Sequence, residues 1–309
     1  MDRFSELDAF VQIARSGSIS AAAERLNVAK SAVSRRLADL EARLGVQLFN
    51  RTTRRVTLTE AGSNFLSRAS ALLDDLEEAE AEASAGMTEL IGKLKIAAPL
   101  SFGLKHLQPV LSKFIDAHPG LDLEIDFSDR KVDLIEEGFD VAVRIGALAD
   151  SSLIARKLCP VRQVVAAAPA FWKEYGAPAH PRDLEKLPCI RYSNIARPEI
   201  VPYWGPGGEA GSLTATIKML ANNGDFLTDM AIDGHGYLIE PTFFLVEPVE
   251  AGALQPALCN FAWAPANLFV LYPPTRRLSQ RVRVFIDALV ERFHNNPYWD
   301  ERINARSID

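Results

Sequence analysis

The sequence predicts an α/β protein in three parts: a small helical head that ends in a β wing, one long helix, and a body of two α/β lobes. Charge is unevenly distributed, a heptad pattern follows the head, and apolar runs alternate with helical patterns along the rest of the 309 residues. We place the head at residues 1–58, the long helix at 59–89 and the body at 90–309, with lobe I at about 90–161 and 268–297 and lobe II at about 162–267.

Composition favours folded domains. Hydrophobic residues make up 48% of the chain and charged residues 24%, which is enough for two buried cores. No apolar run reaches the roughly 18 residues of a membrane helix, and the start of the chain lacks the basic and then apolar order of a signal peptide. Cys159, Cys189 and Cys259 are too far apart in sequence for a disulfide framework. We therefore expect a cytoplasmic protein with reduced thiols.

The chain has a net charge of −6, but its head is basic. Residues 1–62 hold ten Lys or Arg against seven Asp or Glu, whereas residues 63–89 hold one against seven. The remaining residues are nearly balanced, with 23 basic against 26 acidic. A basic head and an acidic connector indicate separate roles, and the head is the part suited to a nucleic acid.

Helical periodicity predicts three short helices in the head. The first carries an apolar stripe over residues 7–14 and breaks at Gly17. The second covers residues 20–26 with Ser20 as a candidate cap, and residues 27–29 form a tight turn. The third helix has one apolar face, formed by Val33, Leu37, Leu40 and Leu44.

The opposite face of the third helix predicts entry into a DNA major groove. Its small Ser31 and Ser34 allow a close approach, and basic residues surround them. A basic tip and a short β alternation at residues 51–58 predict a wing that contacts phosphates or the minor groove. The candidate DNA-binding residues are Lys30, Ser31, Ser34, Arg35, Arg36, Arg51, Thr52, Arg54 and Arg55. The alternative is a small helical bundle with a solvated basic patch.

One segment resembles the winged helix-turn-helix of LysR-type transcriptional regulators: residues 21–62, AAAERLNVAKSAVSRRLADLEARLGVQLFNRTTRRVTLTEAG. The length and layout of the remaining chain also resemble that family, so the resemblance covers essentially the whole sequence. It implies a bacterial DNA-binding regulator of transcription. The implied partners are double-stranded operator DNA, RNA polymerase, a small-molecule effector such as an organic acid or an aromatic compound, and further copies of the chain in a dimer or a dimer of dimers.

This segment departs from the family at the start of the recognition helix. The family usually has Ser or Thr there, whereas this chain has Ala29. A missing cap typically costs about 1 kcal/mol. We therefore expect Ser31 to cap the helix instead, or the helix to start late.

The residues after the wing predict a long helix. A heptad pattern gives a helix of about 28 residues with its acidic side chains off the seam. The seam residues are Phe65, Ala69, Leu72, Leu76, Ala79 and Ala83. Such a helix has little core of its own, so we expect it to pair with a second copy, and the family resemblance implies an antiparallel pair. The alternative is packing against its own body.

Alternating strand and helix patterns predict the body. The first set has strands at 93–98, 121–127 and 140–145 and helices at 104–117 and 132–137. The second set, from about Val164, has helices at 171–175, 226–233 and 243–250 and strands at 189–192 and 213–219; the chain returns through a strand at 268–272 and a helix at 279–294. We expect parallel sheets covered by helices. Two lobes with crossings near residues 160 and 267 resemble the periplasmic-binding-protein-like effector domain of the LysR family.

In such folds, ligands bind at the carboxyl ends of strands beside helix N-termini. The candidate effector-binding residues are Leu100, Ser101, Phe102, Ser128, Arg144, Ile145, Gly146, Asn222 and His235. We expect Ser101 to donate to a carboxylate and Arg144 to pair with it. The alternatives are that Ser101 is a plain helix cap and that Arg144 makes a surface ion pair. His235 either tunes the response to pH or the choice of ligand, or is a partly buried polar residue.

Enzymatic chemistry has little support in the sequence. The five histidines lack metal-ligand spacing, and no GxSxG or GxxxxGKS/T motif occurs. Residues 205–210 match GxGxxA, but Pro206 and the strand that follows favour a turn between strands. We expect no catalytic residue, no metal and no cofactor. A small-molecule binding or transport protein, a cysteine-based redox sensor and an enzyme remain the alternatives to a regulator.

Overall fold

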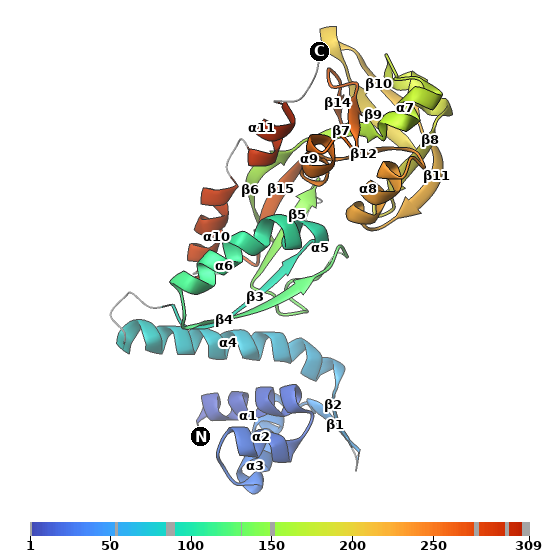
Figure 1. Cartoon of the computed structure of the whole chain (residues 1–309). Coiled ribbons are helices and arrows are strands. Elements are labelled where there is room, and N and C mark those ends of the chain that lie inside the picture. The colour runs from blue at the N-terminus through green and yellow to red at the C-terminus, as the bar shows by residue number, and fades with distance from the viewer. Residues whose placement is uncertain are drawn as a thin grey trace.

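The computed structural model describes residues 2–52, 55–84, 90–130, 132–148, 152–274, 278–293 and 297–304. The head lies on one side of the long helix α4 (Glu60–Ser84) and the body on its other side (Figure 1). Lobe I is next to α4, and lobe II lies beyond it (Figure 1).

Three helices and a two-stranded wing form the head: α1 (Arg3–Ser16), α2 (Ile19–Arg25), α3 (Lys30–Leu44), β1 (Phe49–Thr52) and β2 (Arg55–Leu58). Its core is built around Phe10, whose ring lies 5.4 Å from the rings of both Phe49 and Phe65. Gly17 ends α1 with a φ of 63°, a left-handed conformation that glycine adopts at little cost. The three predicted helices are therefore present, with small shifts in their ends.

Two predicted helix caps are wrong. Ser18, not Ser20, caps α2, because its hydroxyl accepts the backbone N–H of Ala21 at 3.4 Å. α3 begins directly after Ala29, whose side chain makes no capping hydrogen bond, so the helix does not start late and Ser31 is not its cap. The first turn of α3 therefore has no side-chain cap for its N–H groups.

The start of α4 is fixed by Thr59. Its hydroxyl accepts the N–H of Gly62 at 2.9 Å and donates to the carbonyl of Gln47 at 2.8 Å. A Cβ atom on Gly62 would lie 2.0 Å from the carbonyl oxygen of Leu48, so only glycine fits there. With 25 residues, α4 is slightly shorter than the sequence predicts.

Lobe I holds a five-stranded sheet in the order β4-β3-β5-β15-β6. Its strands are β3 (Gly92–Ala98), β4 (Leu121–Phe127), β5 (Val141–Gly146), β6 (Ile154–Val161) and β15 (Ala266–Tyr272). β3 is parallel to β4 and β5, whereas β15 is antiparallel to β5 and β6. The expectation of a purely parallel sheet is wrong, because β15 returns from lobe II in the opposite direction.

Lobe II holds a second five-stranded sheet, β11-β8-β12-β7-β13, and a small sheet, β10-β9-β14. The strands are β7 (Gln163–Ala167), β8 (Pro188–Tyr192), β9 (Ile200–Trp204), β10 (Ala210–Thr214), β11 (Thr216–Ala221), β12 (Tyr237–Pro241), β13 (Gln255–Ala257) and β14 (Ala262–Trp263). β8 is parallel to β11 and β12, and β7 is antiparallel to β12 and β13. This sheet is also mixed.

Two predictions about the segments of lobe II have opposite outcomes. The predicted strand at 213–219 is two strands in different sheets, because the chain turns at Ala215, whose N–H donates to the carbonyl of Glu199 at 2.8 Å. Residues 205–210 join the antiparallel strands β9 and β10. The GxGxxA match is therefore a turn between strands, as predicted.

One continuous helix in lobe I consists of α5 (Leu100–Phe102), the π-helix η1 (Gly103–Leu107) and α6 (Gln108–Ala117). It begins at Leu100 rather than at Leu104. The other helices of the body are α7 (Pro169–Tyr175), η2 (Pro181–Lys186), η3 (Pro206–Gly208), α8 (Gly224–Ile232), α9 (Thr242–Glu250), α10 (Gln280–Arg292) and α11 (Tyr298–Asn304). The sequence did not indicate α11.

The predicted helix at 132–137 is wrong. Residues 134–138 form a turn. The Glu137 carboxylate pairs with Arg130 and accepts the backbone N–H of Asp133 at 3.0 Å. Side-chain bonds of this kind compete with the backbone bonds of a helix.

A buried apolar cluster crosses from lobe I to lobe II. The ring of Phe102 in α5 lies 5.4 Å from that of Phe243 in α9 and 5.9 Å from that of Trp299 in α11. The chain crosses between the lobes at Arg162 and again over residues 264–265. The lobes are thus packed together through α5, α9 and α11.

Candidate DNA interface and ligand site

The outward face of α3 presents the predicted groove residues. Lys30, Ser31 and Arg35 are exposed, and Ser34 is half-buried. The side chain of Arg35 is 81% exposed and lies 4.0 Å from the carboxylate of Asp39. The first turn of the helix has no acidic residue. Val33, Leu37 and Leu40 pack in the core of the head, whereas Leu44, predicted on the same face, is 37% exposed. The outward face therefore offers cationic and hydroxyl donors, which suit phosphates and the edge of guanine.

The remaining predicted DNA contacts are placed differently. Arg36 is half-buried and near Asp2, whose carboxyl pKa is lowered mainly by a hydrogen bond from Ser5 and slightly by Arg36. In the wing, β1 and β2 pair antiparallel in the register Arg51 with Val56 and Thr52 with Arg55. Arg54 lies outside the described residues.

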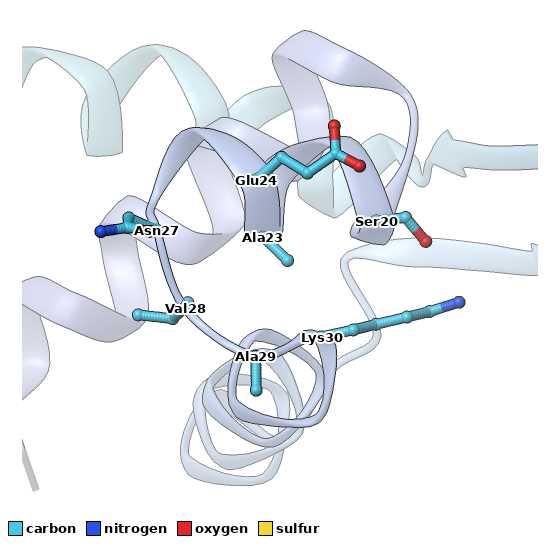
Figure 2. Close-up of a pocket in the computed structure, with 7 residues that line it drawn as sticks. All are labelled: Ser20, Ala23, Glu24, Asn27, Val28, Ala29 and Lys30. Carbon is cyan, nitrogen blue, oxygen red and sulfur yellow. The ribbon is translucent and has the colours of Figure 1, made fainter.

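A shallow recess of about 400 Å³ lies between α2 and the start of α3. Its lining residues are Ser20, Ala23, Glu24, Asn27, Val28, Ala29 and Lys30. Figure 2 shows the hydroxyl of Ser20 and the ammonium group of Lys30 on the same side of this recess. Ser20 thus joins Lys30 at the surface beside α3, a placement that the sequence alone did not indicate.

In the body, Ser101 contacts Asn223 of lobe II, the neighbour of the predicted Asn222. Ser101 is 4% exposed, and its hydroxyl oxygen lies 3.5 Å from the amide nitrogen of Asn223. Asn223 also caps α8, because its side-chain oxygen accepts the N–H of Phe226 at 2.8 Å. Asn222 is exposed and does not make this contact, and its role in effector binding stays a prediction. Ser101 itself lies within α5 and is not its cap.

The start of α5 is occupied by a carboxylate of the chain itself. The N–H of Leu100 donates to the Asp129 carboxylate at 3.3 Å, and Tyr192 of lobe II lies close enough to Asp129 for the two groups to interact electrostatically. Burial raises the pKa of the Asp129 carboxyl. Burial and the neighbouring Asp129 together raise the pKa of Tyr192 to about 12. Asp129 and Tyr192 thus tie the two lobes together, and neither was among the predicted residues.

Arg144 points inward rather than making a surface ion pair. One of its guanidinium nitrogens donates to the carbonyl of Ser128 at 3.2 Å. The other terminal nitrogen is buried and has no hydrogen-bond partner within the described part of the chain. Burial lowers the pKa of Arg144, and the nearby Asp129 opposes this effect. Arg144, Ser128 and Asp129 therefore form one polar group at the carboxyl ends of β4 and β5.

The other predicted ligand residues do not all gather at this junction. Phe102 is buried in the aromatic cluster, and Ile145 packs against the same core. Gly146 ends β5 with a φ of 135°. His235 is exposed in the loop after α8, so the reading as a partly buried residue is wrong. Leu100 is 37% exposed, beside the Asp129 contact.

Two residues of η1 make further contacts, with α8, α9 and α11. The ammonium group of Lys105 lies 2.6 Å from the carboxylate of Asp225 in α8. The ring of His106 bonds to the hydroxyl of Tyr298 at 2.5 Å and to the carbonyl of Phe243 at 3.3 Å. Since burial lowers the pKa of His106 to about 4, the ring is neutral at physiological pH. It donates to the carbonyl and accepts from the hydroxyl.

Comparison with known families gives two matches. Residues 4–63 match the family described as a bacterial regulatory helix-turn-helix protein of the lysR family, and residues 88–294 match the LysR substrate binding domain. The chain belongs to the LysR family of transcriptional regulators. The predicted fold class, an N-terminal helix-turn-helix followed by a two-lobed α/β effector domain, is confirmed.

Individual relatives agree over nearly the full length of this LysR-type regulator. PtxR of Pseudomonas aeruginosa is 34% identical over 298 residues, which cover 95% of this chain and 94% of PtxR. DmlR of Escherichia coli is 33% identical over 291 residues and covers 94% of both chains. The solved structure of CrgA from Neisseria meningitidis, at 32% identity, has a TM-score of 0.59 and covers 94% of this chain and 98% of that one. These relatives are named as transcriptional regulators, not as enzymes.

The long helix of this LysR-type regulator divides the predicted seam in two. Ala69 is fully buried in the core of the head, and Phe65 packs there too, so these two residues contact their own chain. Leu72 is 53% exposed, Leu76 is half-buried and Ala79 is exposed. The side chain of Ala83 lies outside the described part of the structure. Exposure along the predicted seam therefore begins at Leu72.

The thiols of the regulator differ in exposure. Cys159 and Cys189 are buried and Cys259 is exposed. Burial raises the pKa of Cys159 to about 12 and that of Cys189 to about 11, so neither forms a reactive thiolate at neutral pH. Among the described residues, no cluster of His, Cys, Asp and Glu fits a metal ion. Within the same residues, no helix has both the length and the apolar composition needed to cross a bilayer.

Proposed function

We propose that this LysR-type regulator binds double-stranded operator DNA through the outward face of α3 and through the wing. The observation that carries the proposal is the exposed, carboxylate-free start of α3, where Lys30 and Ser31 follow the uncapped Ala29. Free N–H groups at a helix N-terminus attract phosphate, and Arg35 has the paired donors that match guanine. Arg51, Thr52, Arg54 and Arg55 supply the wing contacts in this proposal.

The proposal includes a paired α4. Leu72 and Leu76 of one copy would pack against α4 of a second copy and bring two heads to one operator. Leu104, Ile115 and Phe226 leave a second set of exposed apolar side chains on the body, at 58%, 44% and 47% exposure. Exposed apolar side chains on the body favour contacts with further copies, as a dimer of dimers would provide.

The effector site in this proposal is the junction between the lobes, around Ser101, Asp129, Arg144 and Tyr192. These residues come from both lobes. A small molecule that contacts both lobes therefore favours the lobe arrangement that it binds more tightly, by the difference between its affinities for the two arrangements. Only that difference can change the spacing of the DNA-binding heads. RNA polymerase is the proposed downstream partner, and the cytoplasm, where both DNA and polymerase are found, is the proposed location.

Fluorescence anisotropy with the full chain tests the DNA interface. The probes are a duplex selected from a random pool by binding to the protein and a scrambled duplex of the same composition. Arg35→Ala should cost about 1–3 kcal/mol on the selected duplex and relax the preference at one base pair. Arg283→Ala removes an exposed charge from α10 in the body and should leave binding unchanged. Equal binding of both duplexes, or an unchanged Kd for Arg35→Ala, contradicts the proposal.

A further inference from the structure

A buried carboxyl with an unpaired oxygen lies in the main sheet of lobe II. Glu240 of β12 is 4% exposed, and its Oε1 atom has no hydrogen-bond partner among the described residues. Most buried polar atoms in folded proteins are paired, so an unpaired acceptor needs a physical explanation. A donor brought by a ligand gains the most at such an atom, because it removes an existing desolvation cost.

Glu240 lies beside the residue that links the two lobes. β12 and β8 run parallel, with Leu238 opposite Ile190. Two residues further along, Glu240 and Tyr192 are therefore neighbours on the same face of the sheet. Tyr192 interacts electrostatically with Asp129 of lobe I. The unpaired carboxyl thus lies next to the tyrosine that approaches lobe I.

The charged groups around Glu240 do not pair with it. Arg191 on β8 is the nearest cation, but its guanidinium donates to the carbonyls of Pro198 and Ile239, both at 3.2 Å. On β7 the residue opposite Glu240 is the apolar Val164. From lobe I the facing charged groups are Asp129, beyond Tyr192, and Arg144, which interacts with Asp129 and not with Glu240.

This arrangement selects the charge of a ligand. An incoming carboxylate would meet two acids, Asp129 and Glu240, and the start of α5 is already occupied by Asp129. A protonated amine brings positive charge and N–H donors to the same place. A neutral hydroxyl would supply a donor but leave the carboxylate charge without a partner.

We propose that the effector carries a protonated primary amine, which the Glu240 carboxylate binds beside Tyr192 and Asp129. The proposal rests on the proposed role of the junction as the effector site. It narrows the ligand to small amines, in place of the organic acid expected from the sequence. The amine reaches Glu240 when the Asp129 to Tyr192 contact opens, so binding favours the lobe arrangement in which that contact is broken.

Thermal unfolding of the full chain tests the proposal with methylammonium chloride as the probe. Sodium chloride keeps the ionic strength constant, tetramethylammonium serves as a cation without N–H donors, and sodium acetate tests for an anion site. Methylammonium should raise the Tm of the wild-type protein saturably at pH 8. Because the pKa of Glu240 is about 7, the apparent Kd should be about tenfold weaker at pH 6, where most of the carboxyl is protonated.

Glu240→Gln keeps the shape of the side chain and removes its charge, so it should lose the saturable shift. Glu136→Gln changes an exposed carboxyl of lobe I and should respond as the wild type does. Absence of a saturable shift in the wild type at pH 8, an equal shift in Glu240→Gln, or an equal shift with tetramethylammonium overturns the proposal. Stabilisation by acetate alone does so as well. None of these results affects the operator-binding test, whose failure would remove the proposed function itself.

Discussion

Replacing Glu240 by Gln should change how stability depends on pH. Burial raises the pKa of the folded carboxyl from 4.5 to about 7. The folded state therefore binds more protons than the unfolded state between these values, and the free energy of unfolding falls as pH rises through that window. A pKa shift of this size corresponds to about 3 kcal/mol in the free energy of unfolding. This stabilisation is present below the unfolded pKa and is lost above the folded pKa. Glu240→Gln has no such proton to lose.

Urea unfolding followed by tryptophan fluorescence measures this difference. From pH 5 to pH 8, the stability of Glu240→Gln relative to the wild type should increase by about 2–3 kcal/mol. Other carboxyls with raised pKa values, such as Asp129 and Asp300, are present in both proteins and cancel in the comparison. The control Glu136→Gln should follow the wild type. Parallel pH profiles for Glu240→Gln and the wild type would refute the reasoning that Glu240 is buried without a partner.

Three further predictions concern the head, the long helix and the lobe junction. Leu72→Asp combined with Leu76→Asp would bury charge between paired α4 helices. The double variant should therefore be monomeric in light scattering and bind the operator about 10²-fold or more weakly. A dimeric double variant would show that the seam faces its own chain. Ala29→Ser should raise stability to urea by about 0.5–2 kcal/mol, because it supplies the missing cap of α3; no gain would mean that the helix start is already satisfied. Ser101→Ala and Asn223→Ala should each abolish the ligand-dependent change in operator affinity and keep basal affinity within about tenfold, whereas a normal response in both places the effector elsewhere.

The head was the most predictable part of the chain, because its signals are local. The apolar spacing of α1 and α3 and the break at Gly17 depend on neighbours within two turns. The seam was less predictable, since a heptad pattern shows which face is apolar but not what covers it. Ala69 fits the seam as well as Leu72 does, yet it is buried by the head of its own chain.

The lobe junction depends on long-range pairing, which local patterns do not contain. Asn222 and Asn223 are equivalent in sequence terms, and only the cap of α8 places Asn223 against Ser101. Tyr192 and Asp129 meet because two strands from different lobes end at the same place. Glu240 gave no sequence signal, since a lone Glu at a strand end usually faces solvent.

Cross-linking from α3 to DNA is the most direct test of the claim that this face reads the operator. Ser31→Cys, in a Cys259→Ser background where the other two cysteines are buried, carries a short photoactivated group. Ser112→Cys, an exposed position on α6 of the body, is the matched control. The account predicts cross-links from residue 31 to bases of the selected duplex and none from residue 112. Equal cross-linking from both positions, or none from residue 31 on a duplex that the protein demonstrably binds, would contradict it.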